Sequence, residues 1–270
     1  MIIKNKSIIS SLKGHNSSIR VIRYFSNDKK EEYLLSCDDY CCLTIIWDIQ
    51  DSFNKKYSIK ANIGNIYDAL ILFNVFNNDY ILLSSCDKDK SSQLFEFKEN
   101  TKFIRNIYGT NENKTYYLIP WIYKNKYYII DCCYQKISIN NILEDECYDN
   151  LDMLPEGSHY CGYLFNNNFL CVSDDDNKFI RIWDLVNRSI YKQIKIDGYQ
   201  GLEIIPWNPI YTIVACNDCF VIINIEEGKM IKKVIFEDNT SQLNGIKKIK
   251  LNDLGECLIG SKGHKIILFN

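Results

Sequence analysis

The sequence has no apolar run long enough to cross a membrane. Its longest apolar runs fall far short of the roughly 20 residues that a membrane-spanning helix requires, so we expect no insertion into a membrane. The amino-terminal apolar run is interrupted by Lys4, Asn5 and Lys6 and has no small-residue cleavage site after it, which is unlike a secretory signal peptide. These absences predict a soluble intracellular protein of the cytoplasm.

The chain also lacks an excess of basic charge. Its 32 lysine and arginine residues are balanced by 34 aspartate and glutamate residues, which gives a net charge of −2. General nucleic-acid binders usually have a clear basic excess. We therefore expect no general binding to nucleic acid.

The motifs of common enzyme classes are missing as well. The sequence contains no GxGxxG or GxxxxGK[ST] phosphate loop, no nucleophile elbow and only three histidines. The acidic run Asp174–Asp176 could imitate a metal site, but it lies in an expected hairpin turn, where aspartate is favoured for backbone reasons. The sequence therefore predicts no catalytic residue, no cofactor and no enzymatic activity.

Cysteine, by contrast, is frequent, with 12 residues. Disulfide frameworks are typical of small exported chains, and nothing in this sequence indicates export. Zinc requires four ligands, and the pair Cys216 and Cys219 has no second pair at zinc-ribbon spacing. We expect reduced thiols and no metal site. Four cysteines recur at one place near the end of a strand, where a tapered core accepts small side chains: Cys37, Cys86, Cys132 and Cys216.

A succession of short strands dominates the sequence. Runs rich in isoleucine, valine, tyrosine and phenylalanine recur between asparagine, aspartate and glycine, and none of the four prolines interrupts the first type of run described below. This pattern predicts an all-β fold. The first type of run begins at Tyr33, Tyr80, Tyr127, Phe169, Tyr211 and Cys257. A second type follows each of them and begins at Leu43, Gln93, Ile137, Phe179, Phe220 and Lys265.

These runs recur with a period of a little over forty residues. Markers at the ends of the second runs lie 41 to 50 residues apart, at Trp47, Phe97, Asn140, Trp183, Asn224 and Phe269. A preceding strand has the same period, because Leu118–Trp121 recurs as Ile204–Trp207 two repeats later. Four strands within such a period are typical of propeller blades.

Two of the repeats resemble a known family. The first contains Gly14, His15, Ser36, Asp39 and the pair Trp47–Asp48, and the fourth contains Gly157, His159, Ser173, Asp176 and the pair Trp183–Asp184. This pattern resembles the WD40 repeat, in which histidine, serine, aspartate and tryptophan link neighbouring strands through a side-chain network. The resemblance covers the whole chain by its period, but only the first and fourth repeats by their motif.

The resemblance implies a structural role for eight residues. A buried tryptophan N–H and a serine hydroxyl need hydrogen-bond partners, and a histidine oriented by an aspartate can supply them. A role of either histidine as a ligand is the alternative. The expected network residues are His15, Ser36, Asp39 and Trp47 in the first repeat and His159, Ser173, Asp176 and Trp183 in the fourth.

We therefore predict a single WD40-like β-propeller over residues 1–270 with six four-stranded blades; seven blades would need residues that the chain does not have. The last repeat contains only three runs, so we expect the amino-terminal segment to supply its fourth strand and to protect an exposed sheet edge. The predicted blades span residues 15–60, 61–109, 110–156, 157–198, 199–239 and 240–270 together with 4–12.

A propeller presents a rigid ring of loops, and function resides in those loops. We expect a non-catalytic interaction scaffold that binds a protein or peptide, through the turns between strands four and one and between strands two and three. Tyr40, Tyr160 and Tyr199 fall in or beside such turns and are candidate contact residues, because exposed tyrosine is a common interface anchor. The alternative is a constitutive subunit of a larger intracellular assembly, which could be cytoskeletal, coat-like or associated with a ubiquitin ligase.

Overall fold

A computed structural model gives the fold of the chain. It describes fourteen stretches of the sequence, namely residues 12–38, 42–61, 65–85, 91–108, 115–133, 136–144, 147–152, 161–174, 179–196, 201–216, 219–235, 243–251, 255–262 and 265–269. The chain divides into two compact units, residues 1–106 and 107–270. Each unit is described by itself below.

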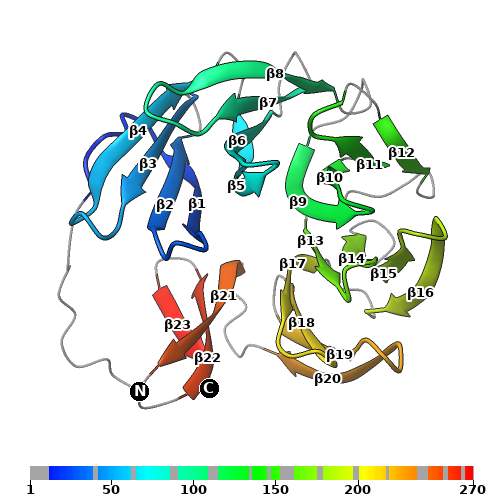
Figure 1. Cartoon of the computed structure of the whole chain (residues 1–270). Coiled ribbons are helices and arrows are strands. Elements are labelled where there is room, and N and C mark those ends of the chain that lie inside the picture. Colours follow the sequence, from blue (N-terminus) through cyan, green and yellow to red (C-terminus); the bar gives the residue numbers. More distant parts are fainter. Residues whose placement is uncertain are drawn as a thin grey trace. The chain divides into compact units, whose positions relative to one another are not determined.

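The first unit contains two four-stranded sheets (Figure 1). The first sheet consists of β1 (Ile19–Ser26), β2 (Glu32–Asp38), β3 (Leu43–Asp48) and β4 (Asn54–Lys60). The second sheet consists of β5 (Ile66–Val75), β6 (Asn78–Ser85), β7 (Ser91–Glu96) and β8 (Lys102–Tyr108), whose last two residues pass the boundary of the unit.

The second unit contains four sheets. The third sheet consists of β9 (Thr115–Tyr123), β10 (Lys126–Cys133), β11 (Lys136–Asn141) and β12 (Cys147–Asp152). The fourth consists of β13 (Gly162–Phe165), β14 (Phe169–Asp174), β15 (Phe179–Asp184) and β16 (Ser189–Lys195). The fifth consists of β17 (Gly201–Pro206), β18 (Tyr211–Cys216), β19 (Cys219–Asn224) and β20 (Lys229–Ile235). The sixth has three strands in the described part of the chain, β21 (Leu243–Leu251), β22 (Gly255–Lys262) and β23 (Lys265–Phe269).

The all-β prediction is confirmed, and every predicted run lies within an observed strand or reaches one residue past its end. All described elements are strands, and each strand pairs with its neighbour in sequence, so every sheet is an antiparallel meander. Tight turns join the paired strands, and positive φ angles at Phe76 and Asn77 produce one of them. Within the described residues, the chain forms no helix that is long and apolar enough to cross a membrane.

Alternating side chains of each sheet pack against the next sheet of the same unit. In the first unit, β1 and β2 contact β5, and the interface is a core that includes Leu35, Ile46 and Leu83. In the second unit, β9 contacts β13, β13 and β14 contact β17, and β17 and β18 contact β21. Within each unit, the first strand of one sheet thus lies beside the first strand of the following sheet. Both faces of the fourth and fifth sheets are apolar.

A repeated backbone hydrogen bond aligns the first five sheets residue by residue. In each of them, the residue after the third strand donates its N–H to a carbonyl near the start of the second strand. The five pairs are Ile49 with Glu32, Phe97 with Asp79, Ile142 with Tyr127, Leu185 with Asn168 and Ile225 with Ile210.

This alignment corrects two of the sequence markers. Trp47 lies two residues before Ile49, the donor of the repeated bond in its sheet, and we call this place the tryptophan position. In the second sheet it is occupied by Phe95, and in the fifth by Ile223. The markers Phe97 and Asn224 therefore lie two residues and one residue beyond the tryptophan position. Spacing alone could not detect this, because the turns between the strands differ in length.

Candidate functional site

The side chains of Trp47, Ser36 and His15 form a continuous hydrogen-bonded chain. The Trp47 indole N–H donates to Ser36 Oγ over 2.8 Å, and Ser36 Oγ lies 2.7 Å from His15 Nε2. His15 Nδ1 lies 3.3 Å from Asp38 Oδ2. A carboxylate only accepts, so the bond to Asp38 requires a proton on Nδ1. In the neutral imidazole with that tautomer, Nε2 accepts the hydroxyl proton of Ser36, whose oxygen accepts the indole N–H.

All four members of this chain are removed from solvent. Only 4% of Trp47 and 4% of Ser36 are exposed, and the side chains of His15 and Asp38 are 6% and 0% exposed. Asp38 Oδ1 also accepts the N–H of Leu43 over 3.1 Å, which fixes the start of β3. The network therefore joins the segment before β1 to β2 and β3, and both ring nitrogens of His15 take part in it.

The carboxylate in this network is that of Asp38, the neighbour of the residue expected from the sequence. Asp39 lies outside the described residues. The role expected for Asp39 therefore stays a prediction, and Asp38, which the sequence motif did not single out, supplies the carboxylate of this network.

Gly14 is required by the packing of the same network. A Cβ atom added at Gly14 would lie 2.7 Å from Ile45 Cδ1 and 3.1 Å from the Trp47 ring. Both distances are shorter than normal van der Waals contact, and Ile45 is fully buried. The glycine before His15 thus lets the backbone lie directly on the indole ring.

The counterpart network in the fourth sheet is built differently. Trp183 lies opposite Leu170, just as Trp47 lies opposite Leu34. Ser36 is two residues after Leu34, and the residue two positions after Leu170 is Val172. The register therefore assigns the place of Ser36 to Val172, and not to Ser173 as the sequence motif suggested.

Ser173 points to the other face of the fourth sheet. Its Oγ lies 3.2 Å from the Sγ of Cys161, and Cys161 belongs to the core between the fourth and fifth sheets. The Trp183 ring belongs to the core on the opposite face. Its indole N–H is buried and has no hydrogen-bond partner in the described part of the chain. His159 and Asp176, the other expected members, lie outside the described residues.

The third sheet has polar residues at the network positions that the sequence motif missed. Asn140 takes the tryptophan position, and its Nδ2 donates to Ser138 Oγ over 3.2 Å. Asp131, opposite Ser138, takes the position of Ser36. All three are buried. Alternation of serine and asparagine with Ile137 and Ile139 was the available signal, because it places polar groups on one face of a buried strand.

The residue after the tryptophan position has a separate, recurrent role. Asp184 Oδ1 accepts the N–H groups of Val186 and Asn187 over 3.0 and 2.9 Å and thereby caps the turn between the third and fourth strands. The bond from Asn187 N–H, with those from its side chain and Val186, holds the pKa of Asp184 below its usual value against the opposing effect of burial. Equivalent caps are made by Asp48, Asn141 and Asn224.

The described cysteines are mostly buried thiols. Burial raises the pKa of Cys37 and of Cys161 to about 12 and also raises that of Cys171, so these thiols stay protonated at neutral pH. Cys216 and Cys219 are buried in the same core as Cys161. Within the described ranges, no three His, Cys, Asp or Glu side chains are grouped so that they could hold a metal ion.

The recurrent small-residue position also follows from the register. It lies three residues after the residue opposite the tryptophan position. In the first, third, fourth and fifth sheets it faces the following sheet of the same unit. Cys37 and Cys132 occupy this position, as expected, whereas Cys216 lies one residue beyond it and Cys86 is outside the described residues. Its occupants are all buried: Cys37, Ser84, Cys132, Ser173 and Ala215.

The three candidate contact tyrosines, Tyr40, Tyr160 and Tyr199, lie outside the described residues, so their role stays a prediction. The comparisons with known proteins add no relative. No protein-family model matches the chain, and no curated protein matches it.

Proposed function

We propose that the six sheets are the blades of one six-bladed, WD40-like propeller that acts as a non-catalytic scaffold for a protein or peptide partner. The observation that supports this best is the contact between first strands of successive sheets within each unit. Stacking side by side along their first strands is how blades surround an axis. Each sheet also lies within one of the repeats expected from the sequence.

Closure of the ring by the amino-terminal segment is supported by an apolar groove beside the fifth sheet. Three fourth strands have an apolar residue at the same position of the sheet, namely Ile59, Ile194 and Val234. Each of them pairs with the third-strand residue that lies three positions before the tryptophan position. Ile59 and Ile194 are 5% and 3% exposed, whereas Val234 is 37% exposed. The first two are covered by the next sheet of their unit, but the sixth sheet has no fourth strand in the described part of the chain to cover Val234.

The groove has the shape and chemistry to take one apolar strand. It has a volume of about 630 Å³ and is lined by side chains of the fifth sheet and by Leu258 of β22. Residues 4–12 contain Ile8, Ile9 and Leu12, and as a fourth strand beside β23 they would bury such side chains against β20. The exposed side chains Ile22 and Tyr24, on the face of the first sheet that points away from the second, would be covered by the same ring closure.

Complementation in trans tests the closure. A chain that lacks residues 1–11 is expected to melt at least 5 °C lower than the full chain, and a synthetic peptide of residues 1–13 is expected to restore most of the loss by binding in the groove. A peptide of the same composition in scrambled order is the control. Equal melting temperatures of the full and shortened chains, or equal rescue by the scrambled peptide, would contradict closure by this segment.

The scaffold function is supported by how the polar side chains are used. His15, Ser36, Asp38 and Trp47 bond to one another inside the fold, so their chemistry serves the architecture. The segments that join the sheets differ in sequence from repeat to repeat, and binding residues are commonly found on such connections.

Affinity capture with turn-exchanged chains tests the scaffold function. A partner co-purified from the native cell is expected to be lost when the turns at residues 39–41, 153–160 and 197–200 are replaced by glycine–serine segments of equal length. Replacement of an exposed turn at the opposite end of a sheet, residues 124–125 between β9 and β10, is the matched control. Unchanged recovery of the partner with the first set would exclude these turns as its contact surface.

A constitutive subunit of a larger assembly is the second candidate function. It is favoured by large apolar side chains at the surface of the separate units, including Ile122 at 57% and Ile235 at 61% exposure. Size-exclusion chromatography of the isolated chain separates the two. A stable monomer supports the reversible scaffold, and solubility only in complex with a partner supports the constitutive subunit.

A further inference from the structure

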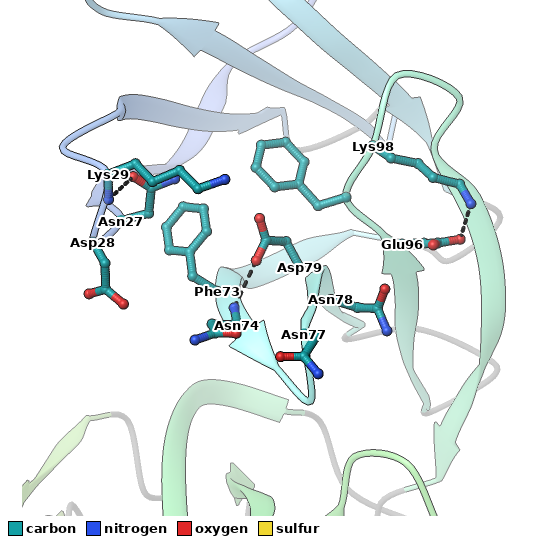
Figure 2. Close-up of a pocket in the computed structure, with 11 residues that line it drawn as sticks. Asn27, Asp28, Lys29, Phe73, Asn74, Asn77, Asn78, Asp79, Glu96 and Lys98 are labelled. Carbon is teal, nitrogen blue, oxygen red and sulfur yellow. Dashed lines mark hydrogen bonds and ion pairs between the residues drawn. The ribbon is translucent and has the colours of Figure 1, made fainter.

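A polar pocket of about 450 Å³ lies between the first and second sheets of the first unit (Figure 2). It is formed by the turn after β1, the turn between β5 and β6 and the turn after β7. Turns after first and third strands lie at one end of an antiparallel meander. The pocket is therefore at the opposite end of these sheets from His15 and from the turns expected to bind the partner.

Aromatic rings line one side of this pocket. Phe73 and Phe97 contribute to the lining, with their ring centroids 6.1 Å apart. Behind them, Tyr33 lies 5.4 Å and Tyr57 5.2 Å from Phe97, both edge-on. Both phenylalanines pack on the core of the unit, so the aromatic side of the pocket is continuous with that core.

The polar side of the pocket is held in place by hydrogen bonds within its turns. Asp79 Oδ1 accepts the N–H of Asn74 over 2.7 Å, and Asn27 Oδ1 accepts the N–H groups of Lys29 and Glu31. The second carboxylate oxygen of Asp79 has no partner among the described residues. Figure 2 shows the Asp79 carboxylate beside the Phe73 ring, with the side chain of Lys29 reaching into the same space.

The aromatic cluster already binds one ammonium group on its other side. Lys56 Nζ lies 4.7 Å from the centroid of the Tyr33 ring and donates to the Tyr33 hydroxyl and to Asp48 Oδ2, each over 3.1 Å. A cation over a ring and beside a carboxylate is a favourable arrangement. On the pocket side, Phe73 and Asp79 offer the same combination, and Figure 2 shows the side chain of Lys29, from an exposed turn, reaching toward it.

We propose that this pocket binds an arginine or lysine side chain of a protein partner, with the cation between Phe73 and the Asp79 carboxylate and with Lys29 displaced into solvent. This inference rests on the scaffold function and adds a second contact surface to it. Three carboxylates line the pocket, those of Asp28, Asp79 and Glu96. Glu96 is paired with Lys98 over 2.5 Å, which leaves an acidic excess that disfavours an anionic group.

Titration of the full chain with short blocked peptides tests the proposal. The probe is acetyl-Ala-Arg-Ala-amide, and the readout is the amide resonance of Asn74, whose N–H is bonded to Asp79. Saturable binding in the millimolar range is expected, as for a single anchored side chain. Acetyl-Ala-Gln-Ala-amide is expected to bind at least tenfold more weakly. Equal binding of the two peptides, or no saturation with either, would overturn the proposal.

Three variants distinguish the cation site from other sites. Asp79→Asn keeps an acceptor for the N–H of Asn74 but removes the negative charge. It is expected to lower the affinity for the arginine peptide about tenfold. Lys29→Gln removes the competing cation and is expected to strengthen the binding of the arginine peptide about threefold. If the pocket were a site for anions, the same variant would weaken the binding of its ligand. Asp51→Asn, at an exposed turn of the same unit, is the control and is expected to change nothing.

Two further outcomes bear on the proposal. Saturable binding of methyl β-glucoside with no response to the arginine peptide would assign the pocket to a carbohydrate and overturn it. The peptide titration needs no native partner, so its result is independent of the capture experiment on the scaffold function. Binding of the peptide without capture of a partner would support the pocket and count against the scaffold.

Discussion

The surroundings of Trp47 in the first sheet and of Trp183 in the fourth differ, although the two tryptophans occupy the same register position. Trp47 donates to Ser36, which is linked through His15 to Asp38. Trp183 lies beside Val172 in an apolar core, and its N–H has no partner among the described residues. Two similar sequence motifs thus surround their tryptophans differently, one with polar and one with apolar side chains.

The difference shows that the indole ring contributes chiefly by packing. Both rings are nearly fully buried, at 4% and 5% exposure, and burial of a large aromatic side chain is worth more than one net hydrogen bond. The polar chain around Trp47 adds a link to the segment before β1, which an apolar contact would not orient as well.

The largest effect is expected from Ser36→Ala. It leaves the Trp47 N–H and His15 Nε2 without their shared partner inside the fold, and a buried group left unsatisfied costs about 1–3 kcal/mol. We expect a loss of about 2–3 kcal/mol in the free energy of unfolding, measured by urea denaturation. In the Trp47→Phe background the loss should be smaller. Equal losses in both backgrounds would mean that the Ser36–Trp47 bond contributes nothing.

A smaller effect is expected when the fourth sheet is made to resemble the first. Val172→Ser places a hydroxyl where Ser36 stands, within reach of the Trp183 N–H. Val214→Ser is the matched control, because Val214 has the same register position and is equally buried in the fifth sheet. The tryptophan position of that sheet is occupied by Ile223, whose side chain has no N–H group that needs a partner. We expect Val172→Ser to cost about 1 kcal/mol less than Val214→Ser. Equal costs would contradict the assigned register.

The smallest effect is expected at the two turn caps. Asp48 and Asp184 both accept backbone N–H groups, but Asp48 also pairs with Lys56 over 3.1 Å. We expect Asp184→Asn to be nearly neutral at pH 7, as Asn224 is a natural precedent, and Asp48→Asn to cost about 0.5 kcal/mol. Thermal melts of both variants at pH 7 would measure this difference.

The pH dependence of the same caps has a definite sign. The pKa of Asp48 is lowered by the Lys56 and backbone bonds, which outweigh the effect of burial, and that of Asp184 is lowered too. A carboxyl whose folded pKa is lowered stabilises the fold above its unfolded pKa and loses this contribution as the pH falls through the folded value. The difference in the free energy of unfolding between the wild type and Asp48→Asn should therefore shrink below about pH 4. A constant difference down to pH 3 would contradict the assignment.

The fold class was predictable because period-2 alternation and turn residues determine strands locally. Runs such as Tyr33–Cys37 and Phe179–Asp184 contain enough apolar residues to define a strand without tertiary context. The period followed from the same runs. How sheets are positioned beyond their own unit depends on contacts between turns of variable length, which a single sequence does not determine.

The site was only partly predictable, because register is a non-local property. His15, Ser36 and Trp47 were recognisable as a set, but a slip of one residue separates Ser173 from Val172, and Asp38 was not singled out as a member of the network. A shift of one residue along a strand exchanges the two faces of the sheet. The polar trio of Asp131, Ser138 and Asn140 was missed because it contains no tryptophan, although its alternation was visible.

Pairing only between strands that are adjacent in sequence also has a consequence during synthesis of the protein. Each sheet needs fewer than fifty consecutive residues, so it can form on the ribosome soon after its last strand emerges, before later repeats exist. If the ring closes as proposed, the exposed face of β1 that bears Ile22 and Tyr24 would be the last surface to be covered. Nascent chains that stall after the first repeats should therefore be the species most dependent on chaperones.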